Sequence, residues 1–145
     1  MVAAPQSYAF TFGSDNEKPS FTFATLRGRL TEIYGAKDSA ALTAAVSLLR
    51  DAQSQREPAV WITSRHSCFF PPDVKEWGVD LSALVLVRVP ETALAQAADP
   101  LLRSGAFGLV IVDLERNVEV PMALQARLLH LAQSHDAALV FLTEP

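Results

Sequence analysis

Cysteine, net positive charge and long apolar runs are all scarce in this chain of 145 residues. The single cysteine, Cys68, excludes an internal disulfide framework and most zinc sites built from cysteines. Twelve Lys and Arg residues stand against 16 Asp and Glu residues, which gives a net charge of -4. Because positive charge is what attracts a phosphate backbone, we expect no direct binding of nucleic acid.

Apolar sequence is interrupted well before the roughly 18 residues that indicate a membrane-spanning helix. The first residues, Met-Val-Ala-Ala-Pro-Gln, lack the basic and apolar regions of a secretory signal. We therefore expect a cytoplasmic protein that does not contact a membrane. A hydrophobic fraction of 50% at this length is typical of one compact domain with its own core.

Five apolar segments have the pattern of buried β-strands, and helical segments separate them. This alternation predicts an α/β domain with a central, mainly parallel five-stranded sheet flanked by helices on both faces. The predicted strands are residues 30–34, 58–63, 84–89, 107–113 and 139–143. The predicted helices are residues 39–53, 73–77, 91–98 and 122–134. Asp99 and Pro100 should interrupt the third helix after Ala98, and residues 100–103 should form a separate turn capped by Asp99.

The N-terminal part has a different pattern. Residues 1–27 are predicted to form an extended arm or a hairpin, and residues 28–145 the core domain. Aromatic residues alternate with other residues in two short runs, residues 8–12 and 21–23, around a connection rich in Gly, Asn and Pro. Such a period of two is typical of strands or extended arms.

Residues 29–42 have the pattern of a strand, a tight turn and the start of a helix, where a phosphate-binding loop would lie. A working loop has the pattern Gly-x-x-x-x-Gly-Lys-Ser/Thr, in which backbone N–H groups and the lysine hold phosphates and the hydroxyl holds Mg²⁺. Gly35 occupies the first glycine position, but Ala40, Ala41 and Leu42 stand at the other three. We therefore expect no bound nucleotide and no cofactor.

Residues inside the loop also disfavour a phosphate. Asp38 or Ser39 is well placed to cap the following helix, and an Asp38 carboxylate in that position would repel a phosphate group. A role for Asp38 as a cap alone predicts the same loss of binding. Lys37 lies inside the loop rather than at the start of the helix, where the ammonium group is needed.

The segment Gly28 to Gly35 resembles the strand and loop entry of the bacterial recombinase family RecA. Four further segments resemble that family in the same order. They are Trp61-Ile62 with His66, residues 78–81, residues 103–106 with 110–113, and residues 139–142. The resemblance covers roughly residues 28–145, and only the combination is specific, because a hydrophobic strand that ends in Asp is weak evidence alone.

The resemblance implies the strand order 3-2-4-5-1, with the N-terminal residues beside strand 1. It places Arg65 where RecA has the glutamate that activates water, and arginine cannot act as a base. It places Asp113 at the Walker B position, where we interpret it as a vestige rather than a Mg²⁺ ligand. The first DNA-contacting loop is shortened, and the chain ends at Pro145 before the second, so direct DNA binding is not expected.

His66 and Cys68 also invite interpretation as a base and a nucleophile. Two residues of separation in a turn, without a third group to orient the base, favour a structural role instead. We therefore expect neither catalytic residues nor a metal site.

A RecA-like chain with an inactive nucleotide loop most resembles the ImuA family of accessory proteins in bacterial damage-induced mutagenesis. The resemblance implies a non-enzymatic protein of SOS-induced translesion synthesis. Its expected partners are RecA and translesion polymerase subunits of the ImuB kind, and it could inhibit RecA-dependent recombination. A cell-division inhibitor like SulA is the alternative, and an unusual ATPase is the least favoured. We expect a monomer or weak oligomer.

Two surfaces are candidates for partner binding. Phe21 and Ala24 resemble the Phe-x-x-Ala strand with which RecA-like recombinases dock on a neighbouring ATPase core. The favoured alternative is that the aromatic residues here cover an edge of the domain's own sheet. The exposed face of the last predicted helix is the second surface, with Gln125, Arg127 and His130.

Overall fold

The computed structural model describes residues 9–10, 21–35, 40–66, 75–116 and 118–144. The strands form one parallel six-stranded sheet in the order β1-β2-β6-β5-β3-β4. They are β1 (Ala9–Phe10), β2 (Leu30–Tyr34), β3 (Ala59–Ser64), β4 (Leu84–Val89), β5 (Leu109–Asp113) and β6 (Ala138–Thr143). The predicted order 3-2-4-5-1 is thereby confirmed, with β1 beside β2.

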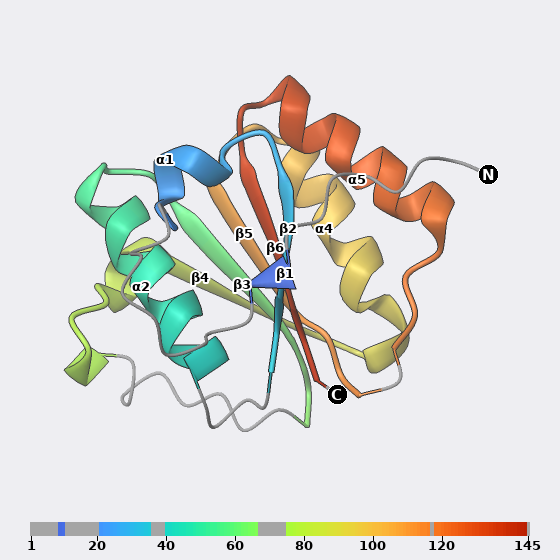
Figure 1. Ribbon diagram of the computed structural model, residues 1–145, viewed down its shortest axis with the longest axis horizontal. Coiled ribbons are helices and arrows are strands. Elements are labelled where there is room, and N and C mark those ends of the chain that lie inside the picture. Colours follow the sequence, from blue (N-terminus) through green and yellow to red (C-terminus); the bar gives the residue numbers. More distant parts are fainter. Residues whose placement is uncertain (1–8, 11–20, 36–39, 67–74, 117, 145) are drawn as a thin grey trace.

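Helices cover both faces of the sheet, as Figure 1 shows, with α1 and α2 on one face and α4 and α5 on the other. Their bounds are α1 (Phe23–Leu26), α2 (Ala40–Ser54), α4 (Leu94–Arg103) and α5 (Met122–Ser134), and two 3-10 turns are Leu81–Ala83 and Glu91–Ala93. Lys75 and Glu76 are helical where a short helix was predicted. In the described part of the chain, none of the helices has the length and apolar character needed to cross a membrane.

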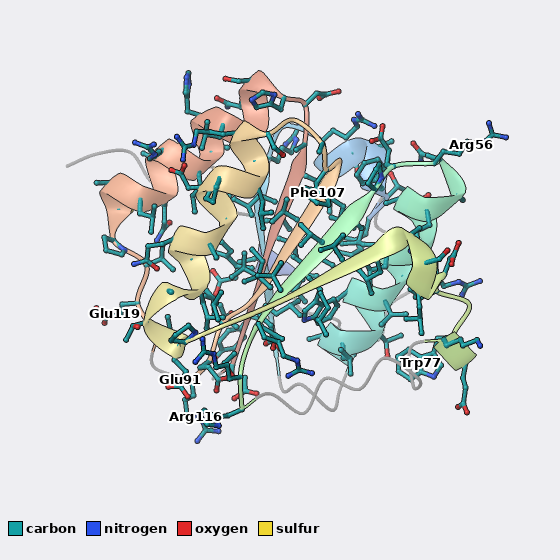
Figure 2. All side chains as sticks on the ribbon, turned by 180° about the vertical axis from the view of Figure 1, so that it is seen from behind. Arg56, Trp77, Glu91, Phe107, Arg116 and Glu119 are labelled. Atoms are coloured by element: carbon teal, nitrogen blue, oxygen red, sulfur yellow. The ribbon has the colours of Figure 1, made fainter. Side chains whose placement is uncertain are left out.

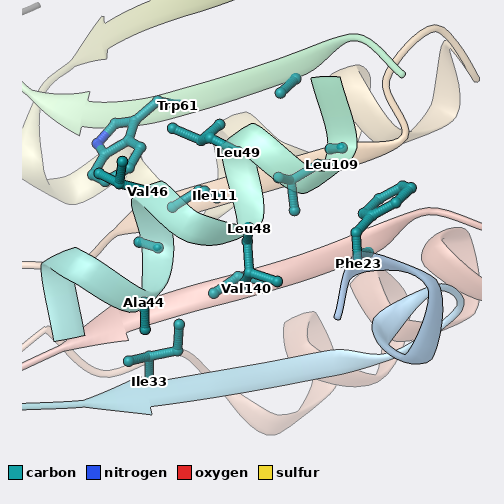
Figure 3. Close-up of a cluster of buried hydrophobic side chains, with 14 of the residues drawn as sticks. Phe23, Ile33, Ala44, Val46, Leu48, Leu49, Trp61, Leu109, Ile111 and Val140 are labelled. Atoms are coloured by element: carbon teal, nitrogen blue, oxygen red, sulfur yellow. The ribbon is translucent and has the colours of Figure 1, made fainter. Parts of the chain in front are cut away.

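Two hydrophobic clusters hold these layers together, because alternate residues of a buried strand face opposite sides of the sheet. Leu109 and Ile111 of β5 enter the cluster under α1 and α2, which we call the α2-side cluster (Figure 3). Val110 and Val112 enter the cluster under α4 and α5, which we call the α4-side cluster. All four side chains are fully buried, which explains why β5 is apolar at successive positions.

The predicted second strand of the arm, residues 21–23, is wrong because a helix begins there. Thr22 caps α1, its side chain and that of Thr25 bonding each other's backbone N–H groups in a capping box. The N–H of Phe23 donates to Asp51 Oδ2 at 2.7 Å, and its ring is buried in the α2-side cluster. Residues 21–23 therefore do not supply the second strand of the predicted hairpin, and β1 pairs in parallel with β2; residues 1–8 and 11–20 of the predicted arm lie outside the described residues.

The predicted break at Pro100 is also wrong, because α4 runs through this residue. The helix continues after the proline, since the N–H of Ser104 donates to the carbonyl of Pro100 at 3.1 Å. Proline removes one hydrogen bond, to the carbonyl of Gln96. Gln96 and Pro100 are both exposed. Water can therefore satisfy that carbonyl, and the helix tolerates the proline.

Candidate functional site

The carboxyl ends of the parallel strands meet at one edge of the sheet, which is where ligands bind in this class of fold. At this edge the predicted nucleotide loop leaves β2, and the N–H of Gly35 donates to the carbonyl of Thr143 at 3.1 Å. The loop residues Lys37, Asp38 and Ser39 lie outside the described residues, so the predicted cap stays a prediction. The start of α2, residues 40–42, is described, and it contains the positions at which a phosphate site needs a glycine, a lysine and a hydroxyl residue.

The positions of the missing lysine and hydroxyl belong to the protein core. Ala41 is 7% exposed and is part of the α2-side cluster, and Leu42 is partly buried against the same cluster. Ala40, at the second glycine position, is exposed. Methyl and isobutyl groups neither neutralise a phosphate nor bind Mg²⁺, so these three positions supply neither the ammonium group nor the hydroxyl that the loop needs.

Hydroxyl and carboxylate groups pair along the same edge. Asp113 is 4% exposed, and its Oδ2 accepts a hydrogen bond of 3.3 Å from Thr63 Oγ1. Ser64 Oγ donates to Glu115 Oε1. Because Thr63 and Asp113 are both buried, their bond gives Asp113 a role in joining β3 to β5 that does not require a metal ion.

A third pair of this kind lies at the end of β6. Thr143 Oγ1 donates to Glu32 Oε1 at 2.7 Å, which joins β6 to β2. Carboxylates of Glu32, Asp113 and Glu115 therefore come to this edge, and like charge makes the edge unfavourable for a triphosphate. The sequence analysis missed the pairs formed by Thr63, Ser64 and Thr143. Their signal was a polar residue at the end of each otherwise apolar strand.

The residues that follow β3 do not assemble a catalytic centre among the described residues. Arg65 and His66 are exposed in the turn after the strand. Cys68 lies outside the described residues, so its relation to His66 stays untested. Within the described ranges, no three His, Cys, Asp or Glu side chains come together in a way that could hold a metal ion.

Phe21 and Ala24 do not form the extended docking strand that their spacing suggested. Ala24 is an exposed residue of the helix α1, and Phe21 is partly buried against the α2-side cluster. A strand that extends a partner's sheet needs an extended backbone, which a helical turn does not offer. The favoured alternative, that these aromatic residues cover an edge of the domain's own sheet, is right in that they pack on their own domain, but Phe21 and Phe23 pack in the α2-side cluster on one face of the sheet rather than at its edge.

The face of α5 holds the other predicted partner-binding residues. Gln125 is partly buried, and its Nε2 donates to the carbonyl of Val120 at 2.9 Å, which ties the helix to the preceding segment. Arg127 and His130 are exposed. Arg127 Nε donates to Asp99 Oδ2, and Arg103 Nε lies 2.6 Å from Asp99 Oδ1. Asp99 therefore connects α4 to α5 through Arg127, and it also pairs with Arg103 of its own helix.

The ion pairs of Asp99 with Arg103 and Arg127 should make the free energy of unfolding depend on pH. The hydrogen bond from Arg127 is the main cause that lowers the pKa of Asp99 below its ordinary value, and the charge of Arg103 adds to it against the effect of burial. Because the folded-state pKa is the lower one, the stabilisation is fully present above the unfolded-state pKa of about 4 and is lost as the pH falls through the folded-state value.

We expect Asp99→Asn to lose about 1 kcal/mol of unfolding free energy at neutral pH. The difference from the unsubstituted chain should shrink as the pH is lowered between about 5 and 2. Urea unfolding followed by circular dichroism at each pH measures it. The exposed Glu119 provides a control, Glu119→Gln (labelled in Figure 2). A difference for Asp99→Asn that stays constant with pH would contradict the assignment.

The sheet order and the place of Asp113 at the end of β5 together define an α/β domain of RecA-like architecture. The model of the RecA N-terminal domain family matches residues 22–133, so the chain belongs to that family. Relatives include Protein RecA of Fusobacterium nucleatum, 37% identical over 89 residues, and Protein RecA of Corynebacterium urealyticum, 39% identical over 89 residues.

These matches cover 60% of this chain but only 23% and 24% of the two relatives, so the chain spans about a quarter of their length. A crystal structure of SulA from Pseudomonas aeruginosa is also similar, with a TM-score of 0.65 over 80% of this chain and 98% of that chain. At 18% identity, this likeness shows that the fold is shared.

Proposed function

We propose that this chain is a non-enzymatic member of the RecA N-terminal domain family that acts by binding other proteins in SOS-induced translesion DNA synthesis. Accessory proteins of the ImuA kind are the model for this function. Its partners would be RecA itself and mutagenic polymerase subunits of the ImuB kind. Binding to RecA would also restrain RecA-dependent recombination.

The start of α2 carries this proposal. Ala41 and Leu42 pack with the α2-side cluster at the two positions where a nucleotide site needs a lysine and a hydroxyl. The RecA resemblance also implies that Arg65 stands where that family has its water-activating glutamate. A family member that has kept the sheet and lacks these groups retains a surface but not the chemistry, which supports a role through contacts.

Nucleotide binding tests the non-enzymatic part. In a calorimetric titration of the chain with ATP and Mg²⁺, we expect no saturable heat, which means a dissociation constant weaker than about 1 mM. A RecA protein titrated in the same buffer provides the positive control. Micromolar affinity for ATP, or steady release of phosphate by the purified chain, would contradict the proposal.

Binding to RecA and to a polymerase subunit tests the proposed role in translesion synthesis. With the chain immobilised on a biosensor, RecA and a translesion polymerase subunit are each passed over the surface, and we expect saturable binding of at least one of them. The heat-unfolded chain on a second surface controls for adhesion to exposed apolar sequence. If neither protein binds at micromolar concentration, the translesion proposal fails.

A second candidate function has one observation in its favour. The structural likeness extends over 98% of the SulA chain, whereas the matched RecA proteins are covered to about a quarter. A SulA-like protein would inhibit cell division by capping a cytoskeletal filament. Sedimentation of the bacterial division filament protein with and without the chain separates the two candidates. Loss of polymer at equimolar chain, together with no binding of RecA, favours the SulA-like function.

A further inference from the structure

A hollow of about 360 Å³ lies on the outer surface between α4 and α5, away from the carboxyl edge pairs described above. We call it the α4–α5 hollow. Its lining comes from one stripe of each helix, because residues three and four apart share a helix face. The lining residues are Gln96, Asp99, Pro100 and Arg103 of α4 and Leu124 and Arg127 of α5.

Two guanidinium groups are held in place at this hollow. The side chain of Asp99 is 13% exposed, whereas those of Arg103 and Arg127 are 57% and 58% exposed. Asp99 engages the Nε atom of each arginine. The guanidinium group has five N–H donors, so most of its donors are not used by this contact. Because Asp99 already restricts both side chains, a ligand would order them at a lower cost in entropy.

The charge at the hollow selects the kind of anion. Two arginines against one aspartate leave a net charge of about one positive unit, so one carboxylate would be balanced. A phosphate group carries nearly two negative charges, so the arginines would attract it as well, but it would leave one negative charge unbalanced and offers no hydrocarbon to the apolar lining. A nucleic acid backbone needs many cations in succession, which this hollow does not supply.

Apart from Gln96, the remaining lining is apolar. Pro100 and Leu124 provide hydrocarbon surface next to the arginines, and the stems of Arg103 and Arg127 add to it. A ligand that fits both parts has a carboxylate with an aliphatic side chain beside it. A short peptide segment that contains Glu and Leu has this composition, and a shallow hollow that is open to solvent can take its side chains without enclosing them.

We propose that the α4–α5 hollow binds an acidic segment of a partner protein. A Glu or Asp carboxylate of the segment lies on Arg103 and Arg127, and a neighbouring aliphatic side chain lies on Pro100 and Leu124. The inference rests on the proposed function in one respect, that the chain acts through protein contacts. The binding itself depends on the hollow alone.

A fluorescein-labelled peptide, Glu-Leu-Glu-Glu-Leu-Glu, is the probe. In ¹⁵N NMR spectra of the whole chain, the Nε–H signals of Arg103 and Arg127 and the amides of α4 and α5 should shift and saturate. Fluorescence anisotropy should give a dissociation constant on the order of 10 to 1000 μM, as expected of a short peptide in a shallow site. A peptide with Lys in place of Glu should not bind.

Substitutions distinguish this hollow from general charge attraction. Arg127→Ala should weaken peptide binding about tenfold, and Leu124→Ala about threefold. Lys75→Ala removes the same unit charge and should leave binding unchanged. Lys75 lies two residues from Trp77, which Figure 2 places on the α2 side, opposite α4 and α5. Arg127→Lys keeps the positive charge but lacks the planar guanidinium group. Its affinity for the peptide should lie between those of the unsubstituted chain and Arg127→Ala.

Three results would overturn the proposal. The first is nonspecific attraction. It would appear as NMR shifts spread over the whole surface, or as an equal loss of peptide affinity in the Lys75→Ala and Arg127→Ala variants. Another is displacement of the peptide by inorganic phosphate below millimolar concentration, which would make the hollow a phosphate site. The third is absence of peptide binding. If the chain still binds RecA or a polymerase subunit in that case, this inference fails and the proposed function stands.

Discussion

Replacing Phe23 with alanine is expected to lower the free energy of unfolding by about 3 to 5 kcal/mol. The ring of Phe23 is fully buried and packs in the α2-side cluster with the side chains of α2 and β6 (Figure 3). Its removal leaves a cavity that a four-residue helix and a sheet cannot close by a small shift. Urea unfolding followed by circular dichroism measures the change.

Phe21→Ala provides the matched control, because Phe21 is partly buried against the same cluster. Its loss should be about 1 to 2 kcal/mol, since less apolar surface returns to water. If both substitutions cost less than about 1 kcal/mol, α1 does not belong to the core in solution. The comparison also bears on function, because a docking role for this segment would require α1 to leave the core at the cost measured for Phe23.

Replacing Arg27 with alanine should have the second largest effect, about 2 kcal/mol. Its Nε donates to the carbonyl and to Oδ2 of Asp136 at 3.1 and 3.0 Å, and Nη1 donates to Glu57 Oε1 at 3.0 Å. The guanidinium carbon also lies 5.0 Å from the centre of the Phe23 ring. One side chain thereby joins the end of α1 to the turns before β3 and β6.

The size of this effect is limited by solvent, because the side chains of Arg27 and Glu57 are 28% and 29% exposed. Arg27→Lys keeps the positive charge but cannot hold both partners with one planar group, so it should lose roughly half as much. Thermal unfolding of the two variants measures the difference. Equal losses would show that the charge alone matters, and no loss in either would contradict the contacts described.

Local sequence was sufficient to predict the sheet and to identify the residues that the nucleotide-loop pattern lacks. Strands such as β5 and β6 are apolar at nearly every position because both of their faces are buried. Such runs are visible without a structure. The residues Ala40, Ala41 and Leu42 were equally visible, since a phosphate loop is a contiguous pattern with fixed residue types.

Two secondary-structure predictions were wrong, the strand at residues 21–23 and the helix break at Pro100. In both, tertiary contacts or exposure outweighed the local sequence pattern. Alternating aromatic residues around Phe23 predicted a strand, but the Thr22 cap and the hydrogen bond to Asp51 favour a helix that buries the ring. Pro100 predicted a break, but α4 continues through this exposed residue. Periodicity reports the neighbours of a residue along the chain and not the partners that the fold brings to it.

The contacts that define the site and the hollow were decided by the tertiary structure alone. Thr63 and Asp113 are 50 positions apart in the sequence, and Asp99 and Arg127 are 28 positions apart. Whether such residues meet depends on the order and register of the strands and on which stripes of two helices face each other. The sequence by itself therefore determined which chemistry is missing at the nucleotide loop, because that chemistry is local. Only the packed sheet and helices decided which polar groups are paired, because each pair joins segments that come together when the core forms.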